Sequence, residues 1–371
     1  MKIGILTLPL HVNYGGILQA YALQTTLERM GHSVFVFDTD KKIDVPKSLL
    51  TYVKRMAKRL FRKNSLPVFY EKKRNKSYPI ISQHTQRFID KYVNRYIVKH
   101  LENIGEKEFD AIIVGSDQIW RPIYFRSPIW TKIEDAFLAF TKGWNIKRLS
   151  YAASFGVEHK EYTDKELVKC REALERFDAV SVREDVAIKQ CREYFGIEAK
   201  HVLDPTMLLD KEDYIALIRQ EDETQCNGVL FEYILDLNSE KTEIIDKISH
   251  EMKLKRFAVK PVDRGKPEEC IYPSVTAWLR AFMDAEFVVC DSFHGVVFSI
   301  IFNKPFLVIG NAKRGMARFT SLLKMFSLEE RMISSIDEVD IFNKPIDWKH
   351  VNAVRTKLKK DSMEFLSANL S

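Results

Sequence analysis

The sequence lacks the features that mark several common classes of protein. Its five cysteines are odd in number, widely spaced and without a Cys-x-x-Cys pair, so we expect neither a disulfide framework nor a zinc site. No apolar run is long enough to cross a bilayer. No segment is of low complexity, and no short repeat recurs. These absences exclude disulfide-rich, membrane-spanning and repeat proteins, and scattered free cysteines are typical of the reducing cytoplasm.

Composition and length indicate a soluble globular protein with more than one domain. Hydrophobic residues make up 46% of the chain and charged residues 29%. At 371 residues the chain exceeds the size of one ordinary core, so two domains are expected. The first residues resemble a short signal, but Pro9 interrupts the apolar run and no small-residue cleavage site follows. We therefore expect Lys2 to Leu8 to be the first β-strand.

The positive charge is concentrated in one region. From Lys41 to Lys76 there are thirteen Lys and Arg residues against Asp44 and Glu71, a local charge of +11, whereas the whole chain carries only +7. The remainder is therefore slightly acidic, which is not typical of a nucleic-acid-binding protein, and we expect no nucleic-acid partner. A patch this local predicts a single docking surface.

Within this basic region, residues 47–63 have the pattern of an amphipathic helix. Apolar residues recur at helical spacing, with others beside them: Leu49, Val53, Met56 and Leu60, and Leu50, Ala57 and Phe61. Cations cover the other face: Lys54, Arg55, Lys58, Arg59, Arg62 and Lys63. Such a helix suits an anionic membrane surface. The alternative is an ordinary helix that packs its apolar side into the first domain and turns its cations to water.

Strand and helix patterns alternate along most of the chain. A strand at Lys2 to Leu8, a helix at Ile17 to Met30 and a strand at Ser33 to Phe37 predict a right-handed βαβ unit with parallel strands. The pattern restarts with a strand at Gly228, after Asp204-Pro205. The sequence therefore predicts an α/β fold with parallel sheets. Further helices are expected at Ser82 to Tyr96 and Asp347 to Leu370.

The most informative stretch runs from Ala285 to Ile300. A continuous apolar run, Phe287 to Cys290, predicts a buried strand, and a helix is expected from Val296. His294 lies between them, at the carboxyl end of a strand and before a helix, where ligands bind in open parallel sheets. Its imidazole can give or take a proton near neutral pH. The alternative is a histidine that caps the helix and satisfies buried backbone groups.

Small and polar residues follow other predicted strands. Gly15-Gly16 does not form the G-x-G-x-x-G pattern of dinucleotide-binding proteins, and it permits either a ligand's close approach or a turn. The stretch Gly115 to Trp120 ends in an aromatic ring, which suits a sugar. Arg183 follows a strand, where it would bind a ligand anion or pair with a carboxylate. Arg318 lies within a turn of helix after a strand-end loop.

Six motifs occur in an order that carries a resemblance. They are Asn13-Tyr14-Gly15-Gly16-Ile17-Leu18-Gln19-Ala20-Tyr21, Gly115-Ser116-Asp117-Gln118-Ile119-Trp120, Tyr151-Ala152-Ala153-Ser154-Phe155-Gly156, Ser181-Val182-Arg183-Glu184, Asp204-Pro205 and Asp291-Ser292-Phe293-His294-Gly295. Taken together, the sequence resembles the polysaccharide pyruvyl transferase family across nearly the whole chain. The resemblance implies two Rossmann-like domains that face each other across a cleft, as in GT-B glycosyltransferases.

The resemblance also implies an activity and a division of the chain. It implies transfer of the enolpyruvyl unit of phosphoenolpyruvate to two sugar hydroxyls as a cyclic ketal, in surface or capsular polysaccharide synthesis in a bacterium. We place an N-terminal, acceptor-side domain at 1–204, a C-terminal domain at 205–346, and a helix at 347–371 that returns to the first domain. The implied acceptor is a lipid-linked saccharide or polysaccharide repeat unit, so we expect a cytoplasmic enzyme with peripheral membrane contact through residues 47–63.

The implied site has one catalytic residue and two groups of binding residues. His294 is the expected proton-transfer residue. The family's best-known members carry Arg where this chain has Ser292, so the charge of phosphoenolpyruvate falls to other cations. The expected donor-binding residues are Arg183, Ser292, Lys313, Arg314 and Arg318. The expected acceptor-binding residues are Asn13, Gly15, Gly16, Ser116, Asp117, Gln118, Trp120 and Ser154. We expect no metal and no cofactor beyond phosphoenolpyruvate as donor substrate.

Two other functions remain open on the sequence. A GT-B glycosyltransferase that uses a nucleotide sugar would have the same fold, since fold does not fix function. An inactive member of the family would bind glycans or serve as a scaffold for a synthesis complex. Phosphate release, nucleotide release or neither would separate the three.

Overall fold

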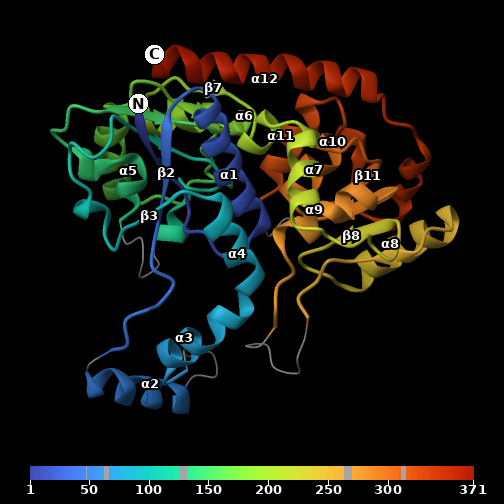
Figure 1. Ribbon diagram of the computed structural model, residues 1–371, viewed down its shortest axis with the longest axis horizontal. Helices are drawn as coiled ribbons and strands as arrows, with labels where there is room; N and C mark the ends of the chain where they lie inside the picture. Colours follow the sequence, from blue (N-terminus) through green and yellow to red (C-terminus); the bar gives the residue numbers. More distant parts are fainter. Residues whose placement is uncertain (47, 62–66, 126–131, 263–269, 311–314) are drawn as a thin grey trace.

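The computed structural model describes residues 1–46, 48–61, 67–125, 132–262, 270–310 and 315–371. Two parallel five-stranded sheets form the body of the protein (Figure 1). The first has the order β3-β2-β1-β4-β5 and the second the order β12-β11-β10-β8-β9. The bounds of the first are β1 Lys2–Leu6, β2 Ser33–Asp38, β3 Arg95–Ile97, β4 Ala111–Val114 and β5 Lys147–Ser150. Those of the second are β8 Leu230–Tyr233, β9 Arg256–Phe257, β10 Phe287–Cys290, β11 Phe306–Ile309 and β12 Met332–Ile333.

Helices connect the strands, and a small pair, β6 Ser181–Val182 and β7 Lys200–His201, lies between the two sheets in sequence. The helices are α1 Tyr14–Arg29, α2 Leu49–Phe61, α3 Tyr70–Ile81, α4 Gln83–Tyr92, α5 Asp164–Leu174, α6 Asp185–Gln190, α7 Lys211–Gln220, α8 Ser239–Met252, α9 Val275–Asp284, α10 Phe293–Ile301, α11 Met316–Met325 and α12 Trp348–Leu370. The central strands β4 and β10 are buried along their whole length, as continuous apolar runs in parallel sheets require. The structure therefore has the α/β fold with parallel sheets that the sequence predicts.

One predicted helix is too long and hides a strand. The expected helix from Ser82 to Tyr96 ends at Tyr92, and Arg95–Ile97 forms β3 instead. The Gln24 side chain ends the helix, because its amide donates to the Tyr92 carbonyl and accepts from the Asn94 N–H. A long-range contact of this kind overrides the helical pattern. At the start of the chain, α1 begins at Tyr14, three residues before the expected Ile17.

The two halves of the chain share a hydrophobic core. One continuous cluster of buried apolar residues includes members of both sheets. At the junction, the Tyr14 ring stacks on Trp278 with 5.5 Å between centroids, and its hydroxyl donates to the Pro273 carbonyl at 3.1 Å. The start of α1 is therefore fixed by residues of the second half.

The last helix, α12, lies across both halves (Figure 1). Near its middle, the Ser362 hydroxyl accepts from the Leu203 N–H at 3.0 Å, and near its end Lys147 donates to the Ser371 carbonyl at 2.6 Å. These contacts tie the helix to residues that precede the second sheet. We propose to divide the domains at Asp204, between the last strand of the first half and the first strand of the second.

Helices α2 and α3 form an arm that extends away from the two sheets (Figure 1). The apolar residues of α2 described by the structure face outward, and Leu49, Val53 and Met56 are each more than half exposed. They therefore do not pack into the first domain, as one of the two alternatives left open by the sequence had required. Lys47, the stretch 62–66 and the side chains of 59–61 lie outside the described part. None of the described helices has the length and apolarity to cross a membrane.

Candidate active site

A cavity of about 510 Å³ lies where the carboxyl ends of the two sheets face each other. Asn13 and Gln118, which follow β1 and β4, line it from the first half. Ser292, His294 and Arg318 line it from the second half. Its volume falls within the range of small-molecule sites, and its place follows the rule that open parallel sheets bind ligands at their carboxyl edge.

Two helices direct their N-termini at this cavity. Asn13 and Ser292 are the N-cap residues of α1 and α10, and both line the cavity. Neither side chain bonds to the backbone N–H groups of its own helix. The first N–H groups of each helix also have no partner within the helix. Together with the positive ends of both helix dipoles, they create a setting that favours an anion.

His294 is held between the two halves of the chain. It is buried in the first turn of α10, and its ring lies against the backbone of Gly15 in α1. A Cβ added at Gly15 would lie 2.0 Å from Nδ1, far inside van der Waals contact, so only glycine leaves room for the ring. Nε2 has no hydrogen-bond partner among the described residues. The imidazole is thus fixed in place between the backbone of α1 and Asp204, whose Oδ2 lies 3.8 Å from Nε2.

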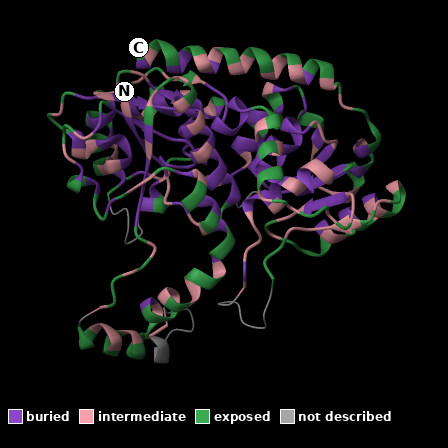
Figure 2. Cartoon of the chain, in the orientation of Figure 1, coloured by how far each residue is buried: buried purple, intermediate pink, exposed green. Residues whose placement is uncertain are grey.

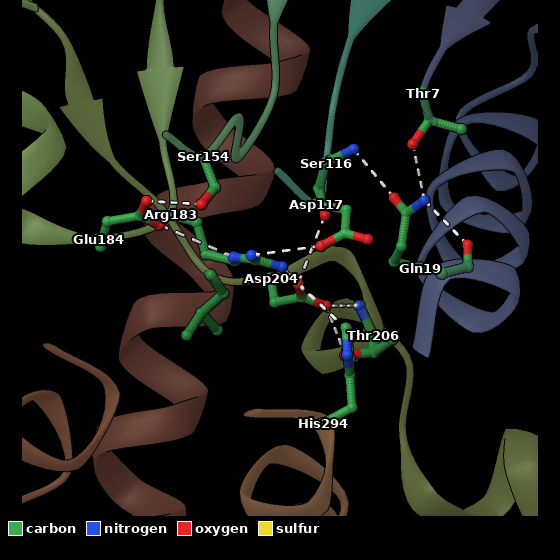
Figure 3. Close-up of polar contacts among 12 residues, drawn as sticks. Thr7, Gln19, Ser116, Asp117, Ser154, Arg183, Glu184, Asp204, Thr206 and His294 are labelled. Carbon is green, nitrogen blue, oxygen red and sulfur yellow. Dashed lines mark hydrogen bonds and ion pairs between the residues drawn. The ribbon is translucent and has the colours of Figure 1, made fainter. Parts of the chain in front are cut away.

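Asp204 is the carboxylate nearest to His294 (Figure 3). Its Oδ1 accepts from the Thr206 N–H at 3.0 Å and from the Thr206 hydroxyl at 2.6 Å. Its Oδ2 lies 2.9 Å from Arg183 Nη1 and 3.8 Å from His294 Nε2. Burial alone would raise the pKa of Asp204, but His294, Arg183 and Thr206 together hold that pKa well below its usual range. Asp204 therefore stays ionised and can stabilise a protonated His294.

Arg183 lies behind Asp204 and not on the cavity wall (Figure 3). Its side chain is 1% exposed, and besides Asp204 it has Asp117 at 3.6 Å and Glu184 at 3.8 Å. Burial would lower the pKa of Arg183, but these carboxylates raise it overall. The guanidinium also lies 4.3 Å from the Phe293 ring centroid. The geometry favours a role in holding Asp204 and the start of α10 rather than direct contact with a ligand.

Arg318 does line the cavity. It projects from the first turn of α11 and is buried. Its guanidinium lies 5.9 Å from the centroid of the Phe293 ring, which Arg183 also contacts. Burial and the charge of Arg183 lower the pKa of Arg318 to about 10, so it remains protonated at neutral pH. The other two cations expected to bind the donor, Lys313 and Arg314, lie outside the described residues.

The predicted acceptor residues separate into two groups. Asn13, Asp117 and Gln118 line the cavity. The others do not line it, and they are Gly15, Gly16, Ser116, Trp120 and Ser154. Trp120 is fully buried, where its ring stacks on Phe137 and its N–H donates to the Ala136 carbonyl. The Ser154 hydroxyl donates to Glu184 at 2.6 Å, so it supports the Arg183 cluster rather than facing a sugar.

Sequence reasoning missed residues on the other side of the cavity. Glu232 and Tyr233 at the end of β8, and Lys260 and Tyr272 in the later connection, line the wall opposite the first half. Glu232 accepts from Lys260 at 2.9 Å. The strand end at β8 could have drawn attention to Glu232 and Tyr233, whereas nothing local in the sequence marks Lys260 or Tyr272.

The described part of the chain contains no group of three or more His, Cys, Asp and Glu side chains arranged to hold a metal ion. Around His294, Asp204 accepts hydrogen bonds from Arg183 and Thr206, and Glu184 accepts one from Ser154.

Comparison with solved structures shows the fold. The chain is similar to UDP-GlcNAc 2-epimerase from Neisseria meningitidis bound to UDP-GlcNAc, with a TM-score of 0.51 and 8% identity over 100% of this chain and 99% of that one. The UDP-GlcNAc 2-epimerase from Methanocaldococcus jannaschii has a TM-score of 0.46 and 12% identity, over 96% of this chain and 99% of that one. An O-GlcNAc transferase mutant from Thermobaculum terrenum has a TM-score of 0.45 and 12% identity, over 100% of this chain and 66% of that longer chain. These are GT-B glycosyltransferases and epimerases, and at such identities the likeness concerns the fold alone.

Comparison at the level of sequence identifies the family. Curated protein sequences give no match. The profile of the family described as Polysaccharide pyruvyl transferase, however, matches residues 13–313, which include the ends of β4 and β10 and most of the residues that line the cavity. Because this match extends over most of the chain, the protein belongs to the polysaccharide pyruvyl transferase family.

Proposed function

We propose that the protein transfers the enolpyruvyl unit of phosphoenolpyruvate to two hydroxyls of a sugar residue, forming a cyclic pyruvate ketal and releasing phosphate. The observation that carries this proposal is His294, a buried imidazole beside an ionised Asp204, at the edge of a cavity onto which two helix N-termini open. Membership of the family supplies the transferase class. The donor and the ketal chemistry are our proposal.

The reaction needs protons to move in two directions. The methylene carbon of phosphoenolpyruvate gains a proton while carbon 2 gains oxocarbenium character and is attacked by one sugar hydroxyl. A second hydroxyl then displaces phosphate from carbon 2. Each hydroxyl loses a proton, and the two protons end on the new methyl group and on phosphate. We assign these proton transfers to His294, which lies beside Asp204. General acid–base catalysis by a positioned imidazole contributes about 10²–10⁴-fold in rate.

The donor carries a carboxylate and a phosphate, and we assign its binding to the cavity's cationic side. Arg318 would pair with one anionic group, and Ser292 and the free N–H groups of α10 would bind the other. This arrangement compensates for Ser292 standing where the family's best-known members have Arg. Lys313 and Arg314 remain proposed donor contacts from the sequence.

We place the acceptor in the rest of the cavity, next to Asn13, Asp117 and Gln118. The proposed acceptor is a saccharide carried on a lipid at the cytoplasmic face of the membrane, for a surface or capsular polysaccharide. On this proposal the enzyme is cytoplasmic, makes peripheral contact with the membrane through residues 47–63, and needs no metal or other cofactor.

The test is a reaction of purified protein with phosphoenolpyruvate and a lipid-linked saccharide fraction. We expect phosphate release together with a pyruvate ketal on the saccharide, detected by mass spectrometry. His294→Ala should abolish both, and Val168→Ser, at an exposed position of α5, is the control. Release of nucleotide from a nucleotide sugar would instead identify a glycosyltransferase, and glycan binding with neither product would identify an inactive scaffold.

A further inference from the structure

The arm formed by α2 and α3 presents an apolar surface to solvent. Leu49 is 77% exposed, Val53 56% and Met56 58%, and they recur at helical spacing along α2. Figure 2 shows the described part of the arm coloured mainly as exposed or intermediate. Leu50 and Phe69 add to the same arm and are also more than half exposed. Single exposed apolar residues are ordinary, but a contiguous set on one helix face marks a binding surface.

A second side of α2, next to the apolar face, packs against α3 and fixes the direction of that face. Arg55 and Glu71 form two parallel hydrogen bonds, of 2.8 Å and 2.6 Å, and Arg55 also donates to the Val68 carbonyl. The Tyr52 ring packs on Phe69 with 5.4 Å between centroids. Arg55 was expected among the solvent-facing cations, but this ion pair with Glu71 engages it. The contacts hold α2 as a preformed helix with its apolar side turned away from the protein.

The charges around this face are almost all positive. Lys54 and Lys58 are exposed on the other side of α2 from these apolar side chains, and Lys72 is exposed on α3. α2 contains no acidic residue. Both acidic residues of the region 41–76 are engaged, since Glu71 binds Arg55 and Asp44 lies 2.8 Å from Lys99. Nothing on the arm would therefore repel an anionic surface.

We propose that the α2–α3 arm is a preformed docking device for an anionic lipid bilayer. The apolar side chains of α2 enter the interface between headgroups and acyl chains, and the long side chains of the exposed lysines reach anionic headgroups. A second copy of this chain is a poor occupant of the same face, because pairing would bring two strongly basic segments together. The proposal stands on exposure and charge alone, and so it is independent of the reaction assigned to the cavity.

Sedimentation of the full-length protein with vesicles tests the proposal. We expect at least tenfold tighter binding to vesicles containing phosphatidylglycerol than to neutral phosphatidylcholine vesicles, and loss of that difference at high salt, because salt screens exposed charges. Equal binding to both vesicle types, or none to either, would refute the docking role. Phosphoenolpyruvate is left out, so failure of docking and failure of the proposed reaction are separate results.

Two sets of variants assign the binding to the arm. Lys54→Gln with Lys58→Gln should weaken binding to anionic vesicles by about 25-fold, since each lysine near the surface contributes about fivefold. Lys357→Gln with Lys360→Gln, at exposed positions of α12, is the control for charge. Leu49→Ser with Val53→Ser and Met56→Ser should lower binding at least tenfold, and Val168→Ser is its control. Equal binding by arm and control variants would overturn the proposal.

Two further measurements complete the test. Because α2 is preformed, the far-ultraviolet circular dichroism of the protein should not gain helix on binding; an increase would contradict the preformed arm, since a free helix of this length is marginal in water. Size-exclusion chromatography over a range of concentrations should give a single species. A dimer that the three serine substitutions abolish would assign the apolar face to a second copy instead.

Discussion

Replacing Gly15 by alanine tests whether the site depends on close packing between the two halves. Gly15 lies in the first turn of α1 at an ordinary helical conformation, where alanine by itself would stabilise the helix by about 0.5–1 kcal/mol. The added methyl group, however, would lie 2.0 Å from His294 Nδ1 and 2.4 Å from Cγ. The three atoms nearest to the added methyl group all belong to the His294 imidazole.

The expected loss follows from the distance. Carbon and nitrogen atoms in contact lie about 3.5 Å apart, so the ring must retreat by about 1.5 Å. Misplacing a catalytic group by about 1 Å costs on the order of 10²-fold in rate. We therefore expect Gly15→Ala to lower kcat about 100-fold or more, while affinity for phosphoenolpyruvate changes little because Arg318 and Ser292 are not displaced.

The assay combines turnover, binding and stability. Phosphate release from phosphoenolpyruvate in the presence of acceptor gives kcat, calorimetry gives the donor affinity, and thermal unfolding reports whether the protein stays folded. Gly16→Ala is the matched variant, because its methyl group would lie 3.3 Å from the Asn13 amide nitrogen, a side chain that can rotate away. We expect the kcat of Gly16→Ala to fall less than tenfold. Full turnover by a folded Gly15→Ala protein would refute the claim that His294 must sit against α1.

Three further predictions concern the charged groups. His294→Ala should lower kcat by about 10²–10⁴-fold with the protein still folded, and a variant with normal turnover would remove His294 from the mechanism. Arg318→Ala should weaken phosphoenolpyruvate binding by one to two decades, about 1.5–3 kcal/mol for one charged hydrogen bond. Arg183→Ala should instead lower the free energy of unfolding by about 3–5 kcal/mol, because it leaves buried carboxylates unpaired. Calorimetry measures the first effect and denaturant unfolding the second, and the reverse pattern would make Arg183 the donor ligand. Because the pKa of Asp204 is depressed in the folded protein, its ionised carboxylate stabilises the fold above the ordinary carboxyl pKa of about 4, and this stabilisation is lost as the pH falls below that value. Asp204→Asn should therefore make the free energy of unfolding, measured with urea, depend less on pH on the acid side. An unchanged pH dependence would contradict this.

The position of His294 could be predicted because its signal is local. A fully apolar strand, a turn and a helix start are adjacent in sequence, and the structure has β10 at the expected place, whereas α10 begins at Phe293, three residues before the expected Val296. The same local logic identified the strand end at β4, after which Asp117 and Gln118 line the cavity. Patterns of this kind need only neighbouring residues, so one sequence suffices to find them.

The partners of His294 could not be predicted, because they arise from packing between distant parts of the chain. Asp204 was visible as a motif, but its 3.8 Å approach to His294 depends on how the two halves meet. The role of Gly15 as space for the imidazole depends on the same contact. Trp120 shows the converse: an aromatic ring after a strand end suggested a sugar, yet Phe137 from a later segment covers it in the core.

The amphipathic pattern of α2 illustrates a third case. The spacing of its apolar residues predicted a helix, and α2 runs from Leu49 to Phe61 within the expected range. The sequence left open whether the apolar face is inside or outside. That choice is decided by the ion pair between Arg55 and Glu71, two residues on different helices, and no periodicity within α2 encodes it.

The contact between His294 and Gly15 joins two segments that lie in different halves of the chain, and this limits how the family can exchange parts. A chimera that combines the first half of this protein with the second half of a relative inherits a functional imidazole only if the incoming ring fits the groove that Gly15 leaves open. Substitutions at the two positions are therefore interdependent. Recombinants built by swapping the segments around both positions together should keep activity where single-segment swaps lose it.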